Sequence, residues 1–118
     1  MTDFTFGLEW DSVSMMNQAL ETLKKLGFKD HEGNEINMGM GFNDNSTKSQ
    51  FVLYGYKDTL AIRLIAYNED QKLLISKGIF DRQNKTVGEK GLVKKEFMPS
   101  QLVEASQFFE SLIAGVSA

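Results

Sequence analysis

The chain contains no cysteine and a single histidine, His31. The absence of cysteine excludes a disulfide framework, thiolate zinc sites and a cysteine nucleophile, and it fits a reducing compartment such as the cytoplasm. A single imidazole leaves few ways to build a histidine-based metal or acid–base site. We therefore expect no metal and no cofactor, and a cytoplasmic location.

Long apolar runs and an excess of basic charge are also missing. No run approaches the roughly 18 apolar residues of a membrane-spanning helix, and the first residues alternate in polarity, which is not the pattern of a signal peptide. The net charge of −3 provides no electrostatic footprint for nucleic acid or for an anionic lipid surface. The length of 118 residues predicts a single globular domain, 1–118.

The strongest pattern that is present predicts an antiparallel meander of three strands. The three runs are rich in β-branched, aromatic and aliphatic residues, and they are separated by polar residues at 57–58 and 68–71. They comprise residues 51–56, 59–67 and 72–80.

Loop length fixes the register of such a meander. A two-residue loop at 57–58 pairs Tyr54 with Ala61, and a four-residue loop at 68–71 pairs Ile65 with Leu74.

Alternation along the three strands separates two faces of unlike chemistry. The first is apolar except for Lys77, so we expect it to face the core; its apolar residues are Phe51, Leu53, Gly55, Leu60, Ile62, Leu64, Ala66, Leu73, Ile75 and Ile79. The second is aromatic and mixed, and it is less polar than a solvated sheet face; it collects Val52, Tyr54, Tyr56, Ala61, Arg63, Ile65, Tyr67, Leu74, Ser76, Gly78 and Phe80.

Two strands, with a helix between them, are expected before the meander. Alternating aromatic and polar residues at 4–10 predict a strand with one buried face, and residues 36–42 predict a second strand, followed by a polar turn at 43–49. Between them, helical spacing of apolar residues predicts a helix from Asp11 or Ser12 to Leu26, ended by a left-handed glycine.

After the meander, residues 81–97 are expected to form a mobile loop that contains a short edge strand at Leu92 and Val93. Pro99 begins a closing helix, because proline is favoured in the first turn, and Gly115 is a plausible end for it.

This order of elements is strand, helix, four strands and helix. It predicts an α+β fold in which an antiparallel sheet of about five strands carries two helices packed on one face. The second sheet face is then either an exposed surface or is covered by the chain itself, through the first strand, the 81–97 loop or the last helix.

If that face is open, it is a candidate for binding a protein. Exposed apolar and aromatic patches usually bind something, and tyrosine and arginine are enriched in interface hot spots. The candidate binding residues are Tyr54, Tyr56, Arg63, Ile65, Tyr67 and Leu74.

Catalytic and metal-binding candidates are weak. Asp30, His31, Glu32 and Glu35 lie close together in the sequence, but within one polar loop that is better read as solvated. Lys77 interrupts the apolar face, and its ammonium group is expected to reach water at the end of the sheet. We therefore expect no enzyme.

The leading hypothesis is a non-catalytic protein-binding module, similar in class to an immunity protein, an inhibitor or a secretion chaperone. Its partner would be another protein or a second copy in a homodimer, and neither nucleic acid nor a membrane. The alternative is a carrier of a small apolar ligand, with a pocket between the sheet and the last helix. Its lining would comprise Phe108, Phe109, Met38, Met40 and Tyr54.

Overall fold

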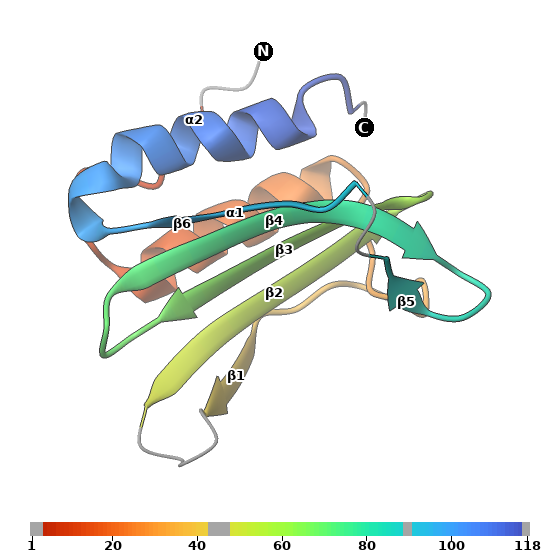
Figure 1. Ribbon diagram of the computed structural model, residues 1–118, viewed down its shortest axis with the longest axis horizontal. Helices are drawn as coiled ribbons and strands as arrows, with labels where there is room; N and C mark the ends of the chain where they lie inside the picture. Colours follow the sequence, from red (N-terminus) through yellow and green to blue (C-terminus); the bar gives the residue numbers. More distant parts are fainter. Residues whose placement is uncertain (1–3, 43–47, 89–90, 117–118) are drawn as a thin grey trace.

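The computed structural model describes residues 4–42, 48–88 and 91–116, so most of the expected polar turn at 43–49 lies outside it. Within these ranges the chain forms a six-stranded antiparallel sheet with its helices on one side (Figure 1). This is the α+β class expected from the sequence.

The strand order in the sheet is β1-β2-β3-β4, with β5 and β6 both paired to the outer side of β4. The strands are β1 (Gly39–Phe42), β2 (Ser49–Lys57), β3 (Leu60–Tyr67), β4 (Lys72–Asp81), β5 (Thr86–Val87) and β6 (Val93–Phe97). Helix α1 (Ser12–Lys25) lies over β2 and β3, whereas α2 (Leu102–Ile113) lies over β4 and β6.

The register of the second hairpin is confirmed, because Ile65 pairs with Leu74 as the four-residue loop requires. The predicted register of the first hairpin is wrong by two positions, since Tyr54 pairs with Arg63 rather than with Ala61. The turn consists of Asp58 and Thr59, and Asp58 takes a left-handed φ of 54°. A shift of two positions keeps every side chain on its face, so the division into two faces holds.

Helix α1 begins and ends as expected. Asp11 is its N-cap, and its carboxylate accepts a hydrogen bond from the Ser14 N–H at 3.2 Å. Gly27 follows the helix with a φ of 88°, and the Phe28 N–H returns to the Leu23 carbonyl at 3.0 Å.

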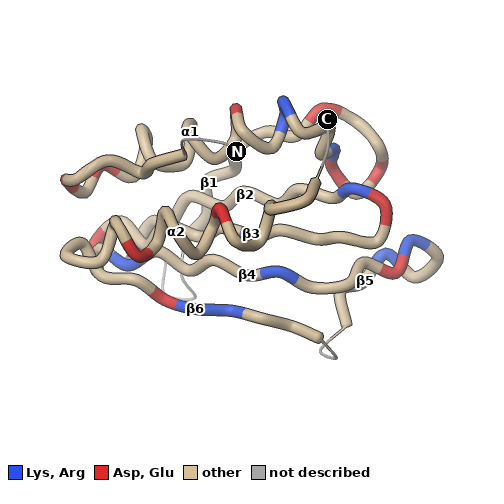
Figure 2. Tube along the Cα trace, turned by 90° about the horizontal axis from the view of Figure 1, so that it is seen from above, with Lys and Arg blue, Asp and Glu red and all other residues tan. Residues whose placement is uncertain are grey.

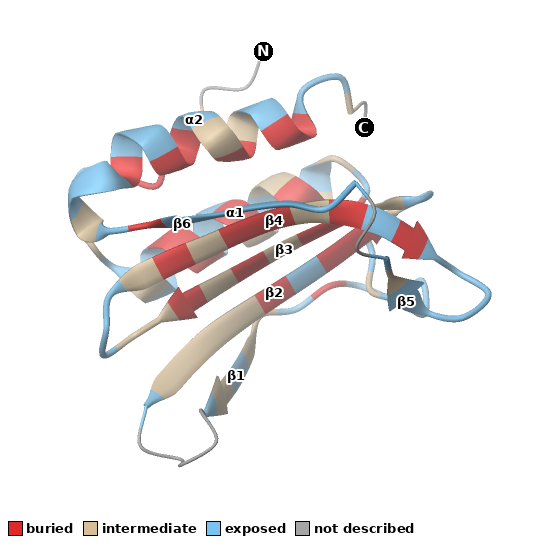
Figure 3. Cartoon of the chain, viewed as in Figure 1, coloured by how far each residue is buried: buried red, intermediate tan, exposed pale blue. Residues whose placement is uncertain are grey.

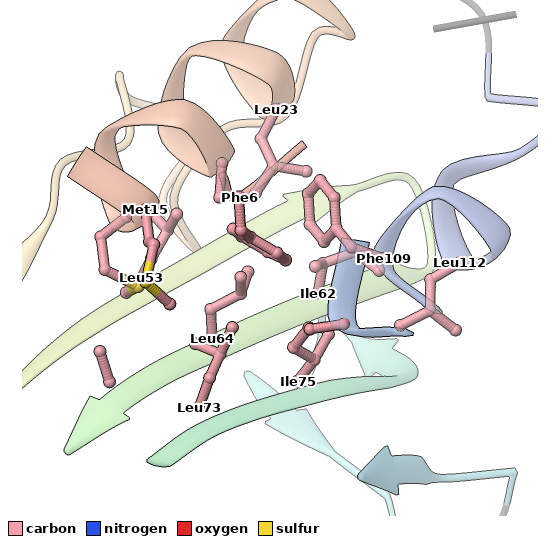
Figure 4. Close-up of a cluster of buried hydrophobic side chains, with 14 of the residues drawn as sticks. Phe6, Met15, Leu23, Leu53, Ile62, Leu64, Leu73, Ile75, Phe109 and Leu112 are labelled. Atoms are coloured by element: carbon pink, nitrogen blue, oxygen red, sulfur yellow. The ribbon is translucent and has the colours of Figure 1, made fainter. Parts of the chain in front are cut away.

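The strand expected at residues 4–10 does not form. The Phe4 and Phe6 N–H groups donate to the side chains of Glu110 and Ser106 on α2, each at 2.9 Å. Phe6 packs near Phe109, with ring centroids 5.7 Å apart (Figure 4). The alternating pattern therefore belongs to an extended segment that buries one side against a helix. Its Phe4 and Phe6 N–H groups bond to side chains of α2 and not to a neighbouring strand.

Two further boundaries differ from expectation. The strand predicted at 36–42 is shorter, since β1 begins at Gly39, although Ile36 is buried in the core. The 81–97 segment is not a continuous loop, because β5 and β6 both add to β4. The short strand predicted at Leu92 and Val93 is instead the five-residue β6, which begins at Val93.

The closing helix begins with a single 3₁₀ turn, η1 (Pro99–Gln101), and continues as α2. The Gln101 side-chain oxygen accepts a hydrogen bond from the Met98 N–H at 2.9 Å, which caps this start. Gly115 follows α2 with a φ of 84° and ends the helical layer as expected.

The core lies between the helices and the apolar sheet face (Figures 3 and 4). Most of the face predicted to be buried is buried, and Leu53, Ile62, Leu64 and Ile75 are all fully enclosed. Ile79 is the exception, with 57% of its surface exposed. Burial along β4 changes sides near Ser76, so that Gly78 and Phe80 on the opposite face are enclosed instead.

Candidate binding face

The helix-free face of the sheet is divided into a covered end and an open end. At the covered end Tyr56, Ala61 and Phe80 form a second, smaller apolar cluster with Val87 of β5. The Tyr56 and Phe80 rings lie 4.4 Å apart, and Tyr56 is only 8% exposed. Tyr56 is therefore not available as a binding residue, which corrects the contiguous patch expected from the sequence.

A glycine on β4 lets the chain cover this end. The covering segment, here called the arm, comprises residues 82–88 and carries β5. A Cβ added to Gly78 would lie 2.6 Å from Val87 Cγ1 and 3.4 Å from Leu92 Cδ1. Only a residue without a side chain allows Val87 to approach the sheet this closely.

The open end keeps the remaining predicted site residues together. Val52, Ile65 and Leu74 are cross-strand neighbours on β2, β3 and β4. Beside that apolar row lie the directly paired Tyr54 and Arg63, and Tyr67 lies at the next position on the other side. We call this surface the open face; it comprises Val52, Tyr54, Arg63, Ile65, Tyr67 and Leu74.

The open face is partly accessible. Tyr54 is 41% exposed and the other five residues are half-buried. In Figure 1 α1 lies behind the strands and α2 lies above them, and both helices contribute their buried residues to the core on the opposite face of the sheet.

Arg63 lies on the central strand of the open face, next to the covered end, with an incomplete set of contacts. Its guanidinium carbon lies 5.3 Å from the centroid of the Tyr54 ring, in a cation–π arrangement. Its Nε is buried, and it has no hydrogen-bond partner among the residues that the structure describes.

Strand β6 adds charges to one side of the same face. Glu96 pairs with Leu74, and Lys94 pairs with Ser76, so both are placed on the side of the sheet that carries Arg63. Figure 2 shows these opposite charges next to each other along β6. Burial raises the pKa of the Tyr67 phenol, and the Glu96 carboxylate and Tyr54 raise it further.

On the other side of Tyr54 is a small hollow of about 260 Å³. The loop before β1 and the edge of β2 line it, through Asp30, His31, Glu35, Asn37, Gly39, Val52, Tyr54 and Tyr56. Three of the four weak metal or acid–base candidates therefore border the candidate face, which the sequence did not indicate.

The acids of this loop are engaged in local contacts. The Asp30 carboxylate accepts hydrogen bonds from the Glu32 and Asn34 N–H groups, both at 2.8 Å, and the Asn34 bond in particular lowers its pKa. Glu35 pairs with Lys24 at 2.6 Å, which lowers the pKa of Glu35 and raises that of Lys24.

The described residues contain no cluster of three or more side chains able to hold a metal ion. The fourth candidate, Glu32, forms a contact of 3.3 Å with the imidazole of His31. Lys77, the other oddity in the sequence, is half-buried on β4.

The five residues expected to line an apolar ligand pocket are not brought together. Phe109 is fully enclosed in the core, whereas Met40 is 65% exposed at the edge of the sheet and Tyr54 lies on the opposite face. A hollow of about 460 Å³ does occur near α2, but its lining comes from Leu26 and the exposed end of that helix, including Gln107 and Glu110.

Sequence reasoning missed Lys94, Glu96 and the hollow. The alternation of Val93, Lys94, Lys95, Glu96 and Phe97 could have identified β6 as a charged edge strand, since lysine is favoured at sheet edges. The hollow had no comparable signal, because its walls are distant in sequence.

Comparison with models of protein families, with curated proteins and with solved structures finds no match for the chain. Among the described residues, no helix has the length and apolar character needed to cross a membrane.

Proposed function

We propose that this chain is a non-catalytic binding protein that engages a protein partner through the open face. The observation that carries the proposal is a half-buried apolar row beside the exposed Tyr54 and beside Arg63, on a sheet whose other end the chain covers itself. Such a face combines exposed apolar area with the residue types that dominate interface hot spots.

The class of partner protein is argued by analogy. A small, mildly acidic α+β chain without cysteine fits an inhibitor, an immunity protein or a chaperone that works in a reducing compartment such as the cytoplasm. Self-association through the open face would make the protein a homodimer. The ligand-carrier alternative is less favoured, because its expected lining residues lie on opposite sides of the sheet.

The test compares two substitutions of exposed residues by glutamate. Tyr54 is 41% exposed on the open face, and Val13 is 47% exposed on α1. Light scattering first gives the molar mass of the wild type and shows whether it is a dimer. A protein that binds to the immobilised wild type is then tested for binding to each immobilised variant.

Tyr54→Glu should reduce binding, or dissociate a homodimer, by about 10-fold or more, as expected of a central hot-spot residue. Val13→Glu should leave binding unchanged. Equal loss in both variants, or no loss in Tyr54→Glu, would contradict the use of the open face.

A further inference from the structure

Arg63 is a cation without a counterion among the described residues. No residue that the structure describes forms a hydrogen bond or an ion pair with it, and its buried Nε lacks an acceptor. A buried donor without an acceptor is costly and rare. The terminal nitrogens of the guanidinium are not among the buried atoms, so they are the donors that a partner can reach.

The charges around Arg63 are mostly of the same sign. Lys72 pairs with Tyr67 and Lys94 pairs with Ser76, so three cations share this side of the sheet with one carboxylate, that of Glu96. The chain as a whole has a net charge of −3. Asp30 and Glu35 also border this face beyond Tyr54, but backbone N–H groups and Lys24 engage them, so the remaining charge of the open face is mainly basic and favours an acidic partner.

We propose that the open face binds a protein segment in which an aspartate or glutamate is adjacent to an apolar side chain. This inference rests on the proposed function and specifies the chemistry of the partner. The carboxylate accepts from the two terminal N–H groups of Arg63, because a guanidinium offers paired donors that match a carboxylate. The apolar neighbour packs on the row of Val52, Ile65 and Leu74.

Two other occupants are less well supported. A two-fold contact centred on this face would place Arg63 near its own copy, because such a contact uses the same patch twice. Single-stranded nucleic acid could stack on tyrosine, but three cations on an acidic chain are a weak phosphate-binding footprint.

The test is a selection of short random peptides displayed on phage, with the wild-type protein immobilised. Enriched peptides are synthesised with a fluorescent label, and their affinity is measured by anisotropy. We expect them to share an acidic residue beside an aliphatic or aromatic one. Arg63→Gln should weaken their binding by about 10- to 100-fold, the loss of one charge-assisted hydrogen-bonded pair.

Replacing the acidic residue of the peptide by its amide should cost the same, and combining both changes should cost little more, as expected for two directly coupled groups. Arg82→Gln is the matched control. Arg82 also lies over an aromatic ring, 5.6 Å from the centroid of Phe80, but its Nε donates to the Asp58 carbonyl at the covered end. This variant should bind the peptides like the wild type.

The thermal unfolding midpoint of Arg63→Gln should fall only slightly, because the native side chain loses its stacking on Tyr54 but no hydrogen bond to a described residue. A large fall would contradict the view that Arg63 is unpaired in the free protein.

The remaining outcomes separate this inference from the proposed function. Peptides that require Tyr54 and Leu74 but no carboxylate, and that bind Arg63→Gln normally, would overturn the inference alone. If no enriched peptide depends on Tyr54, both proposals fail. Binding of labelled oligothymidylate that Arg63→Gln abolishes would replace the acidic segment by nucleic acid, and a dimer that the same variant dissociates would replace it by a second copy.

Discussion

The two ends of the helix-free sheet face are built from similar residues but completed differently. Each has an arginine over an aromatic ring, Arg82 over Phe80 and Arg63 over Tyr54. At the covered end Arg82 donates to a backbone carbonyl and Phe80 is 2% exposed. At the open end Arg63 Nε has no hydrogen-bond partner within the described part of the chain, and Tyr54 is 41% exposed. The chain thus satisfies one end internally, and we propose that a binding partner satisfies the other.

The largest expected effect on the free energy of unfolding comes from removing a buried side chain at the covered end. Phe80→Ala removes an enclosed ring that packs on Tyr56, and such truncations cost about 3 kcal/mol or more of the free energy of unfolding. Chemical denaturation measures this loss.

Tyr54→Ala is the matched change at the open end. Its ring is already partly hydrated, so its loss should cost about 1 kcal/mol or less. Equal costs for the two truncations would mean that the open face is as well packed as the covered end, and the distinction between them would be lost.

A smaller effect is expected from Gly78→Ala, which tests how the covering is achieved. The added methyl group meets Val87 Cγ1, so either the arm or the strand must move, at about 1–3 kcal/mol of the free energy of unfolding. Denaturation gives this number, and hydrogen exchange of the Gly88 N–H, which donates to the Ile79 carbonyl at 3.2 Å, shows whether the arm has moved.

Gly88→Ala is the control, because a Cβ at Gly88 meets nothing within 4 Å. It should change stability by about 0.5 kcal/mol or less. If Gly78→Ala were equally mild, the arm would not depend on this close approach.

These differences between the two ends mark the limit of what the sequence predicts. Period-two alternation assigned the two faces correctly, and that assignment survived a hairpin register wrong by two positions because the shift preserves the face. The turn itself was missed since both 57–58 and 58–59 are polar pairs, and only the left-handed φ of Asp58 decides between them.

The candidate site was predicted in part for a similar reason. Tyr54 and Tyr56 have the same local pattern, but Tyr56 joins Phe80 and Ala61 in a cluster against which Val87, distant in sequence, packs. Periodicity indicates which side of a strand is apolar, but it does not indicate whether a segment further along the chain covers that side. The N-terminal segment illustrates the same point. Phe4 and Phe6 belong to an alternating pattern typical of a strand, but their backbone N–H groups donate to side chains of α2.

The smallest expected effect is a local response to acid at each end. Asp81 anchors the turn into the arm, and its pKa is lowered chiefly by a hydrogen bond from the Asn84 side chain. Asp30 anchors the loop beside Tyr54, and its pKa is lowered chiefly by the Asn34 N–H. Because each folded pKa lies below the ordinary 3.8, the stabilisation is present above that value and is lost as the pH falls through the folded pKa.

The amide chemical shifts of Asn84 and Asn34 should therefore titrate with acid, each with a midpoint below the ordinary aspartate value. Asp81→Asn should abolish the titration of Asn84 and leave that of Asn34, and Asp30→Asn should do the reverse, since an asparagine oxygen still accepts the hydrogen bonds but carries no charge. If the two amides titrated together in either variant, the ends of the face would be coupled. Acid would then loosen the arm and the Tyr54 loop as a single unit, and the open face could not be treated as independent of its cover.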